Sequence, residues 1–281
     1  MPSFLADTSD IDQDQLTLRG DELHHLRVRR CQVGEVIEVI DGRGGFFSVR
    51  IEAIEHERAT GVILARVPER GEAEVDLTLA CALIKGDRFD SAVEKGTEIG
   101  VRTIIPFRCK RSIARDASRT KLERWRRIAQ EAAKQSGRSR IPEVKEPADF
   151  DAELTGHSSH GSLRLMAVAR AEMPSLRQAV EGVSCTAAGV TLFIGPEGGF
   201  EPEEEQQAMA AGVRAFAWGG DHTLRVDTAA VVLSALVLYQ LGGYDEPERN
   251  GGGGGTNTGP ERSQPEHAGF EGARNLRFCN S

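Results

Sequence analysis

The sequence predicts an α/β protein in which an open sheet of parallel strands, flanked by helices, follows a small β-rich domain. From residue 75 onward, short apolar runs alternate with segments of helical periodicity, as in successive β-α-β units. Before that point, short β-branched and apolar runs are separated by glycine-rich turns. A chain of 281 residues is long enough for two such domains, each with its own core.

We expect the first domain over residues 1–68. Residues 36–40 and 46–51 are rich in β-branched and apolar side chains, so they are predicted to be strands. The intervening segment, residues 41–45, contains Asp41 and three glycines, which indicates a hairpin turn. Residues 69–75 are mostly polar and follow Pro68, so they are expected to form a linker.

The second domain is expected over residues 76–244. Its candidate parallel strands are residues 77–84, 103–107, 163–168 and 190–194. Its candidate helices are residues 89–99, 121–137, 175–183, 203–211 and 228–241. Beyond residue 244 the chain is rich in glycine and polar residues and lacks apolar content, so residues 245–281 are predicted to be a disordered tail.

Composition indicates a reduced, cytoplasmic protein. The five cysteines are odd in number and include no C-x-x-C pair, which argues against a disulfide framework and a zinc site, and no metal is expected. Residues 1–14 are acidic, and no long uncharged apolar run occurs, so neither a signal peptide nor a membrane span is expected.

Charge is distributed unevenly along the chain. The formal net charge is -8, yet residues 85–140 carry 16 Lys/Arg against 7 Asp/Glu, a local net charge of +9. A basic segment within an acidic protein indicates a directed patch for a polyanion such as RNA, and the alternative is a solvated helix face.

The predicted helix 121–137 has two faces. A buried stripe is expected from the spacing of Leu122, Trp125, Ala129, Ala132 and Ser136. A second face is expected to carry four cations that suit a ladder of phosphates, namely Arg124, Arg127, Lys134 and Arg138. Trp125 shares the apolar stripe, so the pattern favours a core position for it over base stacking.

A glycine-rich loop follows the last predicted strand. Residues 195–199 read Gly-Pro-Glu-Gly-Gly, and glycine permits positive φ and a close approach of backbone to a ligand. Glu203, Glu204 and Glu205 follow in the first turn of the next helix, where they suit the helix dipole but repel an anion. The loop therefore favours a small flat ligand over a phosphate, and it matches neither a dinucleotide fingerprint nor a P-loop.

A second loop, residues 218–229, reads Trp-Gly-Gly-Asp-His-Thr-Leu-Arg-Val-Asp-Thr-Ala and leads into the last apolar helix. Together the two loops resemble those of the SPOUT methyltransferases. Gly-Pro-Glu-Gly-Gly followed by Leu-Arg-x-Asp-Thr-Ala resembles, more narrowly, the bacterial 16S rRNA (uracil N3) methyltransferase family. The resemblance extends over residues 16–242 and includes the segments 83–88, 94–101, 124–129 and 135–138.

This resemblance implies an S-adenosylmethionine site, a trefoil knot in the second domain and a PUA-like, RNA-binding barrel in the first. It also implies a homodimer. The residues it assigns to the cofactor are Ile194, Gly195, Pro196, Glu197, Gly198, Gly199, Gly219, Leu224 and Arg225.

Three residues are candidates for catalysis. Arg225 could hold the oxygen of a uracil losing its N3 proton, because a guanidinium presents several donors in a plane; alternatively it neutralises Asp227 or Glu197. Asp227 stands where the family usually has Glu, and the pattern favours an N-cap for the helix at 228 over a general base. Glu197 is expected to orient substrate or cofactor, and His222 is a weak candidate base.

RNA contacts are assigned to basic residues in both domains. In the first domain these are Arg27, Arg29 and Arg30, where the family usually has a more apolar sequence. Lys85, Arg88 and Lys95 match a family motif, and the helix contributes Arg124, Arg127, Lys134 and Arg138.

The sequence thus predicts S-adenosylmethionine-dependent methylation of N3 of one uridine in 16S rRNA of the small ribosomal subunit. Two alternatives stay open at this point. One is a SPOUT enzyme acting on a ribose 2′-hydroxyl or another base, and the other is a non-catalytic ribosome-assembly protein that binds RNA.

Overall fold

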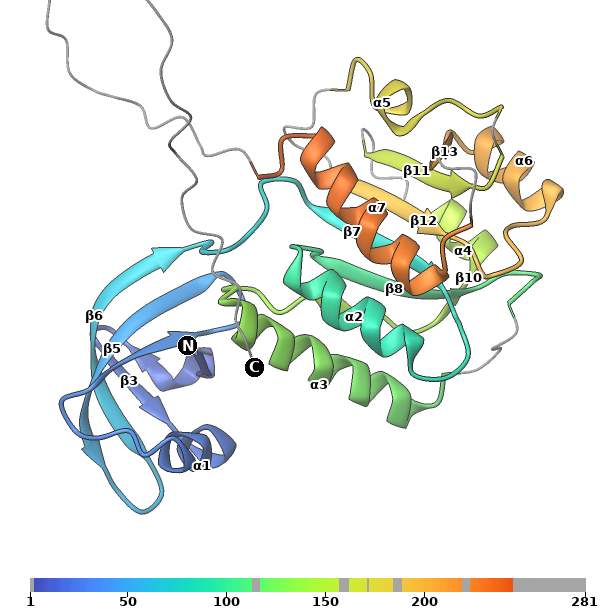
Figure 1. The fold of residues 1–281 in the computed structure, drawn as a ribbon. Coiled ribbons are helices and arrows are strands. Elements are labelled where there is room, and N and C mark those ends of the chain that lie inside the picture. Colours follow the sequence, from blue (N-terminus) through green and yellow to red (C-terminus); the bar gives the residue numbers. More distant parts are fainter. Residues whose placement is uncertain are drawn as a thin grey trace, which may run out of the picture. The chain divides into compact units, whose positions relative to one another are not determined.

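The computed structural model describes residues 3–112, 117–156, 162–170, 172–183, 189–218 and 223–244 (Figure 1). The first domain is a curled six-stranded sheet with strand order β1-β4-β5-β6-β3-β2. Its elements are β1 (Phe4–Leu5), η1 (Thr8–Asp10), β2 (Ile11–Asp12), β3 (Gln15–Leu18), α1 (Gly20–Val28), β4 (Val36–Ile40), β5 (Gly45–Ile54) and β6 (Ala59–Pro68).

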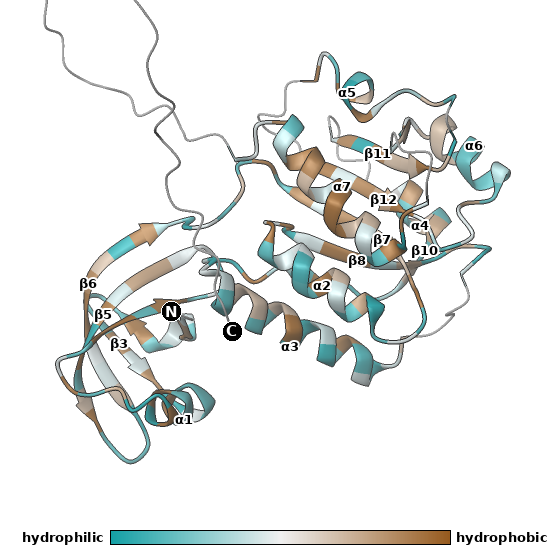
Figure 2. Cartoon of the chain, in the orientation of Figure 1, coloured by the Kyte–Doolittle hydropathy of each residue, from teal (hydrophilic) through white to brown (hydrophobic). Residues whose placement is uncertain are grey.

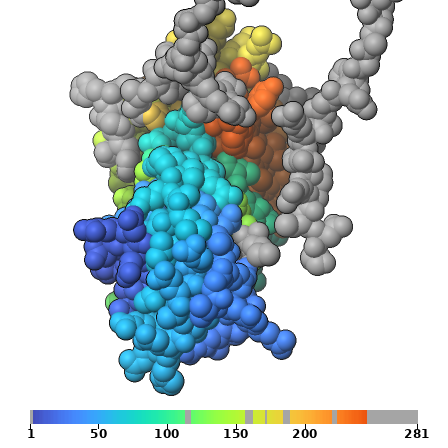
Figure 3. Space-filling view, turned by 90° about the vertical axis from the view of Figure 1, so that its left-hand side faces the viewer, coloured from blue at the N-terminus to red at the C-terminus, as the bar shows by residue number. Residues whose placement is uncertain are grey.

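Alternation of side chains builds the core of this β domain. Along β5, Phe47, Val49 and Ile51 are buried, and they pack with Ile37 and Val39 of β4. Irregular register at Ser48/Val49 and Ile51/Ala53 bends β5, which helps the sheet to curl. The predicted strand 36–40 is confirmed, and the predicted strand 46–51 lies within the longer β5, whereas α1 was not predicted. Figure 3 looks onto this domain, drawn in blue and cyan.

The second domain is a parallel sheet with strand order β10-β8-β7-β12-β11-β13, to which β9 adds beside β8. Its strands are β7 (Leu77–Ala82), β8 (Thr103–Arg108), β9 (Glu143–Val144), β10 (Ala148–Asp149), β11 (Leu163–Val168), β12 (Val190–Ile194) and β13 (Arg214–Ala217). Its helices are α2 (Arg88–Glu98), α3 (Arg119–Ser136), α4 (Phe150–Gly156), α5 (Leu176–Ala179), α6 (Pro202–Ala210) and α7 (Val226–Gln240).

Both faces of this sheet are covered, as a parallel sheet requires. Leu77, Leu79 and Cys81 of β7 face a core that includes α2, α3 and α7, whereas Ala80 and Ala82 face a core that includes α4 and α6. Figure 2 shows hydrophobic residues along the central strands and α7, and hydrophilic residues over much of α3. Among the described residues, no helix combines the length and apolarity needed to span a membrane.

The predicted strands 163–168 and 190–194 agree with β11 and β12, and 77–84 and 103–107 differ from β7 and β8 by one or two residues. Strand β13 and helix α4 were not predicted. Helix 175–183 is wrong in length, because α5 ends at Ala179 and Gly182 adopts a positive φ of 73°. The predicted tail, residues 245–281, lies outside the described residues.

Helix α3 corrects two predictions. Trp125 is a core residue as expected: it lies against Phe89, with ring centroids 4.4 Å apart, and its Nε1 donates to Asp90 at 2.9 Å. Ser136, predicted to be buried, is exposed. Lys134 and Arg138, predicted to contact phosphate, are 4% and 1% exposed. Both cations are therefore structural.

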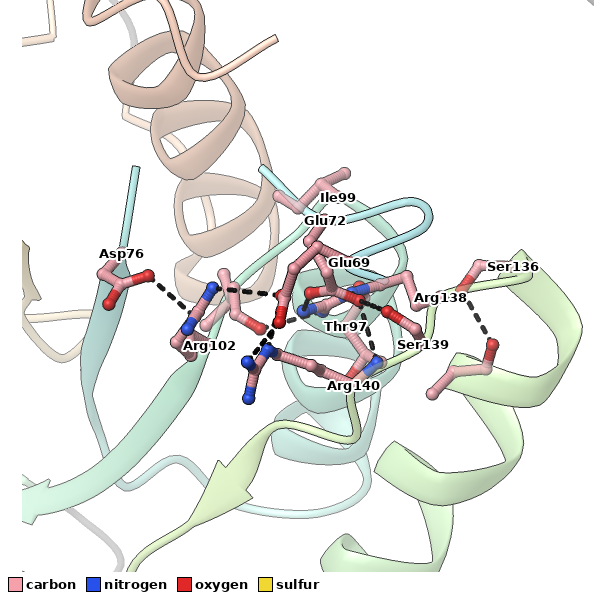
Figure 4. Close-up of polar contacts among 12 residues, drawn as sticks. Glu69, Glu72, Asp76, Thr97, Ile99, Arg102, Ser136, Arg138, Ser139 and Arg140 are labelled. Atoms are coloured by element: carbon pink, nitrogen blue, oxygen red, sulfur yellow. Dashed lines mark hydrogen bonds and ion pairs between the residues drawn. The ribbon is translucent and has the colours of Figure 1, made fainter. Parts of the chain in front are cut away.

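Arg138 forms the centre of a buried polar cluster (Figure 4). Its Nη2 and Nε donate to the Glu72 carboxylate at 2.5 and 3.3 Å, and its Nη1 donates to the carbonyls of Thr97 and Val101 at 2.7 and 2.9 Å. The Glu72 side chain is only 3% exposed. The segment predicted to be a linker thus holds a buried carboxylate, which a solvated linker has no reason to bury.

The same cluster reaches the β domain. Glu72 also accepts a hydrogen bond from the backbone N–H of Arg140 at 2.9 Å, and Arg140 pairs with Glu69. The backbone N–H of Gly44, in the β4–β5 turn, donates to the Ser139 carbonyl at 3.2 Å. One turn earlier on α3, Lys134 Nζ contacts Glu22 of α1 at 2.7 Å. The end of α3 therefore ties the two sheets together.

We expect Arg138→Ala to lower the free energy of unfolding by about 3–5 kcal/mol, because it leaves the Glu72 carboxylate buried without its cation. Urea denaturation measures this change. Arg127→Ala, at an exposed position of α3, is the control and should change stability by less than about 0.5 kcal/mol. A similar small change for both variants would contradict the structural role of the pair.

Candidate functional site

A cleft of about 900 Å³ opens at the carboxyl ends of β11 and β12. Neighbouring parallel strands end at the same edge of a sheet, and this edge is where open α/β sheets bind ligands. The cleft is lined by residues from β11 and the segment after it, the glycine loop, the start of α6, the segment before α7, and α7 itself. The sequence-predicted residues in this lining are Ile194, Gly195, Pro196, Glu197, Gly198, Gly199 and Leu224.

The three glycines of the loop are subject to different structural constraints. A Cβ on Gly195 would lie 2.9 Å from the ring of Phe200. That ring cannot move aside easily, because it is 4% exposed and lies 5.1 Å from Phe150 and 6.1 Å from Phe107 between ring centroids. Gly199 has a φ of 70°, and its N–H donates to the Pro196 carbonyl at 2.8 Å. Gly198, in contrast, does not have a positive φ.

The start of α6 explains the glutamates after the loop. Pro202 occupies the first turn, and Glu204 accepts hydrogen bonds from the backbone N–H groups of Glu201 and Lys110, both at 2.8 Å. Glu205 pairs with Arg170, and burial raises the pKa of Glu205 although Arg170 acts in the opposite direction. Glu204 therefore fixes the start of α6 against the segment after β8, Glu205 holds Arg170, and only Glu203 of the three is exposed.

Arg111 is a site residue that the sequence analysis missed. It lies in the loop after β8 and lines the cleft. Its Nη1 donates to the Gly198 carbonyl at 2.7 Å, and its Nε and Nη2 donate to the two Glu201 carboxylate oxygens at 2.8 and 3.1 Å. It lies within the basic segment 85–140, but nothing in its local sequence distinguishes it from the other cations there.

Glu197 connects two predicted sets of residues. Its carboxylate lies 3.1 Å from Nη1 of Arg88, at the start of α2, and both side chains are partly exposed. The predicted RNA-binding motif at 83–88 and the predicted cofactor loop are therefore in direct contact.

Arg225 and Asp227 lie at the start of α7. Arg225, not Asp227, is the N-cap residue, and Asp227 lies within the first turn, so the capping role predicted for Asp227 is wrong. Nε of Arg225 lies 3.6 Å from Oδ1 of Asp227, which is the neutralising contact considered above. Arg225 is 62% exposed and neither side chain is among the residues that line the described cleft. Gly219 and His222 lie outside the described residues.

Cys81 lies buried at the end of β7. Burial raises the pKa of its thiol to about 12, and the negative charges of Asp227 and Glu197 act in the same direction. The thiol is therefore protonated near neutral pH, and a thiolate nucleophile is not available at this position.

The remaining predicted RNA contacts are divided between paired and open positions. Arg124 contacts Asp90 at 2.5 Å, Lys95 contacts Glu98 at 2.8 Å, and Arg27 donates to the carbonyls of Glu55 and His56 at 2.7 and 2.8 Å. Arg29 lies over the Phe4 ring, 4.9 Å from its centroid. Lys85, Arg30 and Arg127 are exposed.

Comparisons with known proteins agree with this architecture. Residues 71–238 match the model of the RNA methyltransferase domain family, and residues 18–64 match that of the RNA methyltransferase PUA domain. A Ribosomal RNA small subunit methyltransferase E from Synechocystis sp. is 34% identical over 223 residues, which cover 79% of this chain and 72% of that protein.

Two solved structures are similar along most of their length. The Neisseria gonorrhoeae Ribosomal RNA small subunit methyltransferase E bound to S-adenosyl methionine is 28% identical, with a TM-score of 0.74, and the match covers 85% of this chain and 97% of that one. A methyltransferase from Legionella pneumophila, in complex with bound SAM, is 26% identical with a TM-score of 0.71, covering 85% of this chain and 97% of that one.

Fold, cleft and matches together define an RNA methyltransferase with a SPOUT-type α/β domain and an added PUA-like β domain. The chain belongs to the ribosomal RNA small subunit methyltransferase E family. The sequence predicts the cofactor at the glycine loop, and the cleft is lined by that loop, so the geometry of the loop is tested first.

We expect Gly195→Ala to lower the free energy of unfolding by about 1–3 kcal/mol, because the new methyl group meets the packed Phe200 ring. Gly198→Ala is the control: its Cβ would lie 3.4 Å from Cδ of Arg111, an ordinary contact, so the change should stay within about 1 kcal/mol. Urea denaturation of both variants measures these changes. Equal losses in the free energy of unfolding would show that Phe200 does not constrain the loop.

Proposed function

We propose that this protein transfers a methyl group from S-adenosylmethionine to N3 of a specific uridine in 16S rRNA. The observation that carries the proposal is the glycine-loop cleft in a chain of this family. Relatives named as small subunit rRNA methyltransferases, one of them solved with S-adenosyl methionine bound, support it.

The residues of the cleft fit this cofactor. Ile194, Leu224 and Leu233 supply apolar surface, which suits an adenine ring. The glycine loop supplies backbone donors and acceptors at close approach. Among the described lining residues, the cations Arg111 and Arg170 are each paired with a carboxylate, Glu201 and Glu205, so neither is free to hold a ligand bearing phosphates. When bound, S-adenosylmethionine supplies an electrophilic methyl group on a positively charged sulfur.

Methylation at N3 requires that the uracil lose its N3 proton and that the resulting charge on its oxygens be stabilised. We assign the second role to Arg225, whose exposed guanidinium can donate to a uracil oxygen. Asp227 is the candidate for accepting the proton. Its Oδ1 is buried and, among the described residues, receives no hydrogen bond, only the 3.6 Å ion-pair contact with Arg225. Glu197, paired with Arg88, is proposed to orient the substrate.

The RNA is proposed to lie along the exposed cations Lys85, Arg88 and Arg127 and the basic end of α1. The protein is further proposed to act in the cytoplasm as a homodimer. Exposed Leu236 and Tyr239 on α7, with 41% and 75% of their surface accessible, support a partner at that helix.

The experiment is to analyse 16S rRNA from a strain lacking the gene, by primer extension and nucleoside mass spectrometry. We expect one reverse-transcription stop and its N3-methyluridine to be absent, because a methyl group on the Watson–Crick face blocks the polymerase. Wild-type protein should restore both. A missing 2′-O-methyl group or another methylated base would contradict N3 chemistry, and unchanged rRNA would favour a non-catalytic RNA-binding protein.

With purified protein and unmethylated 16S rRNA, Arg225→Ala should lower kcat for methyl transfer by about 10²–10³-fold, the usual cost of removing one oxyanion donor. RNA affinity should change little. Arg127→Ala serves as the comparison. It should weaken RNA binding and reduce the slope of log K against log salt by about one unit, while the rate at saturating RNA stays near that of wild type. The reverse result would make Arg225 a binding residue.

A further inference from the structure

The loop after β8 reaches across the sheet edge to the loop after β12. Within residues 109–112, the Cys109 N–H donates to Ser112 Oγ, and the Ser112 N–H donates to the Cys109 carbonyl, both at 3.0 Å. Ser112 is 6% exposed, so this turn is anchored in the protein. Arg111 therefore projects from a turn that has hydrogen bonds of its own, in addition to its contacts with the glycine loop and the start of α6.

Arg111 donates hydrogen bonds to the glycine loop and to the residue that begins α6. One N–H group holds the Gly198 carbonyl at 2.7 Å, and two more hold both oxygens of Glu201, the residue that begins α6. The bidentate pair fixes direction as well as distance, because the guanidinium and carboxylate planes must align. The adjacent Lys110 N–H adds a bond to Glu204 at 2.8 Å, so both ends of the contact are secured.

A loop with three glycines among five residues samples many backbone shapes when nothing holds it. A ligand that must select one of these shapes loses affinity in proportion to how rarely that shape is populated. Side chains that fix the shape in advance remove that loss. Arg111 is suited to this task, because its contacts are to the loop backbone and to the helix start that follows it.

We propose that Arg111 is a positioning residue that sets the glycine loop in its ligand-binding shape before the cofactor arrives. The inference rests on the proposed function, since it takes S-adenosylmethionine to be the ligand of this cleft.

The test compares Arg111→Ala with Lys110→Ala in the full chain. Lys110 is the matched control: it is the adjacent cation, its side chain is 60% exposed and lies 3.8 Å from Glu203, and its backbone bond to Glu204 survives the substitution. Binding of S-adenosylhomocysteine is measured by calorimetry. Arg111→Ala should weaken binding about 10-fold or more, the scale of losing hydrogen bonds to a charged group, and Lys110→Ala should change it less than about twofold.

Two further measurements separate positioning from direct contact. In the ligand-free protein, amide hydrogen exchange at Gly199 and Glu201 should be faster in Arg111→Ala but unchanged in Lys110→Ala. Both amides donate hydrogen bonds within the segment that Arg111 contacts, so losing Arg111 should expose them more often. Arg111→Lys should recover binding only in part, because an ammonium group keeps the positive charge but cannot form the bidentate pair with the Glu201 carboxylate. If Arg111→Ala does not fold, Glu201→Gln tests the same pair from the other side and should show the same faster exchange.

The outcomes are distinct. If the wild-type protein binds no S-adenosylhomocysteine, the proposed function is refuted. Amide hydrogen exchange at Gly199 and Glu201 then tests, without a ligand, whether Arg111 fixes the glycine loop. Wild-type binding with equal affinity in Arg111→Ala overturns the positioning role. Weaker binding with unchanged exchange in the ligand-free protein also overturns it, because Arg111 then touches the ligand directly.

Discussion

The buried pair of Glu72 and Arg138 is the contact on which the packing of the two sheets depends in the part of the chain that the structure describes. Arg138 directly follows Gly137, the C-cap of α3, whose φ of 74° changes the direction of the chain at the end of the helix. The guanidinium then satisfies the carbonyls of Thr97 and Val101 at the end of α2 while it neutralises Glu72. Such a pair is weak evidence for net stability, but breaking it is costly, because the remaining charge stays buried. Its value here is that it fixes geometry.

That geometry extends in both directions. Toward the β domain, the residues after Arg138 pair with the β4–β5 turn, through Ser139 with Gly44 and through Arg140 with Gly42. Toward the sheet, α2 and α3 pack on β7 and β8 in one core. Since Arg88 at the start of α2 contacts Glu197 of the glycine loop, the segment proposed to meet RNA and the cleft belong to one connected set of contacts.

Local sequence was enough for elements whose signal is local. Residues 190–194 form an apolar run that ends in glycine, and they form β12 with those bounds. Strand β13 was missed because it has only four residues and begins with Arg214. The glycine loop was found from its composition, but which glycine each constraint concerns depends on Phe200 and on the backbone turn, and neither follows from the order of residues.

Charge was the least predictable feature. Lys134 and Arg138 have the spacing of a surface ladder, yet their partners are Glu22 and Glu72, far away along the chain. Arg111 was passed over for the converse reason, since its partner Glu201 belongs to a loop 90 residues later. A cation's role is decided by which carboxylate the fold brings to it, and periodicity carries no information about that.

The most direct test of this account is a crystal structure of the full chain with S-adenosylhomocysteine. We expect the ligand in the cleft between the glycine loop and α7, within hydrogen-bonding distance of the backbone of residues 195–199, and the bond from Arg111 to the Gly198 carbonyl unchanged. Ligand bound at another place, or a glycine loop released from Arg111 when the ligand is present, would contradict it.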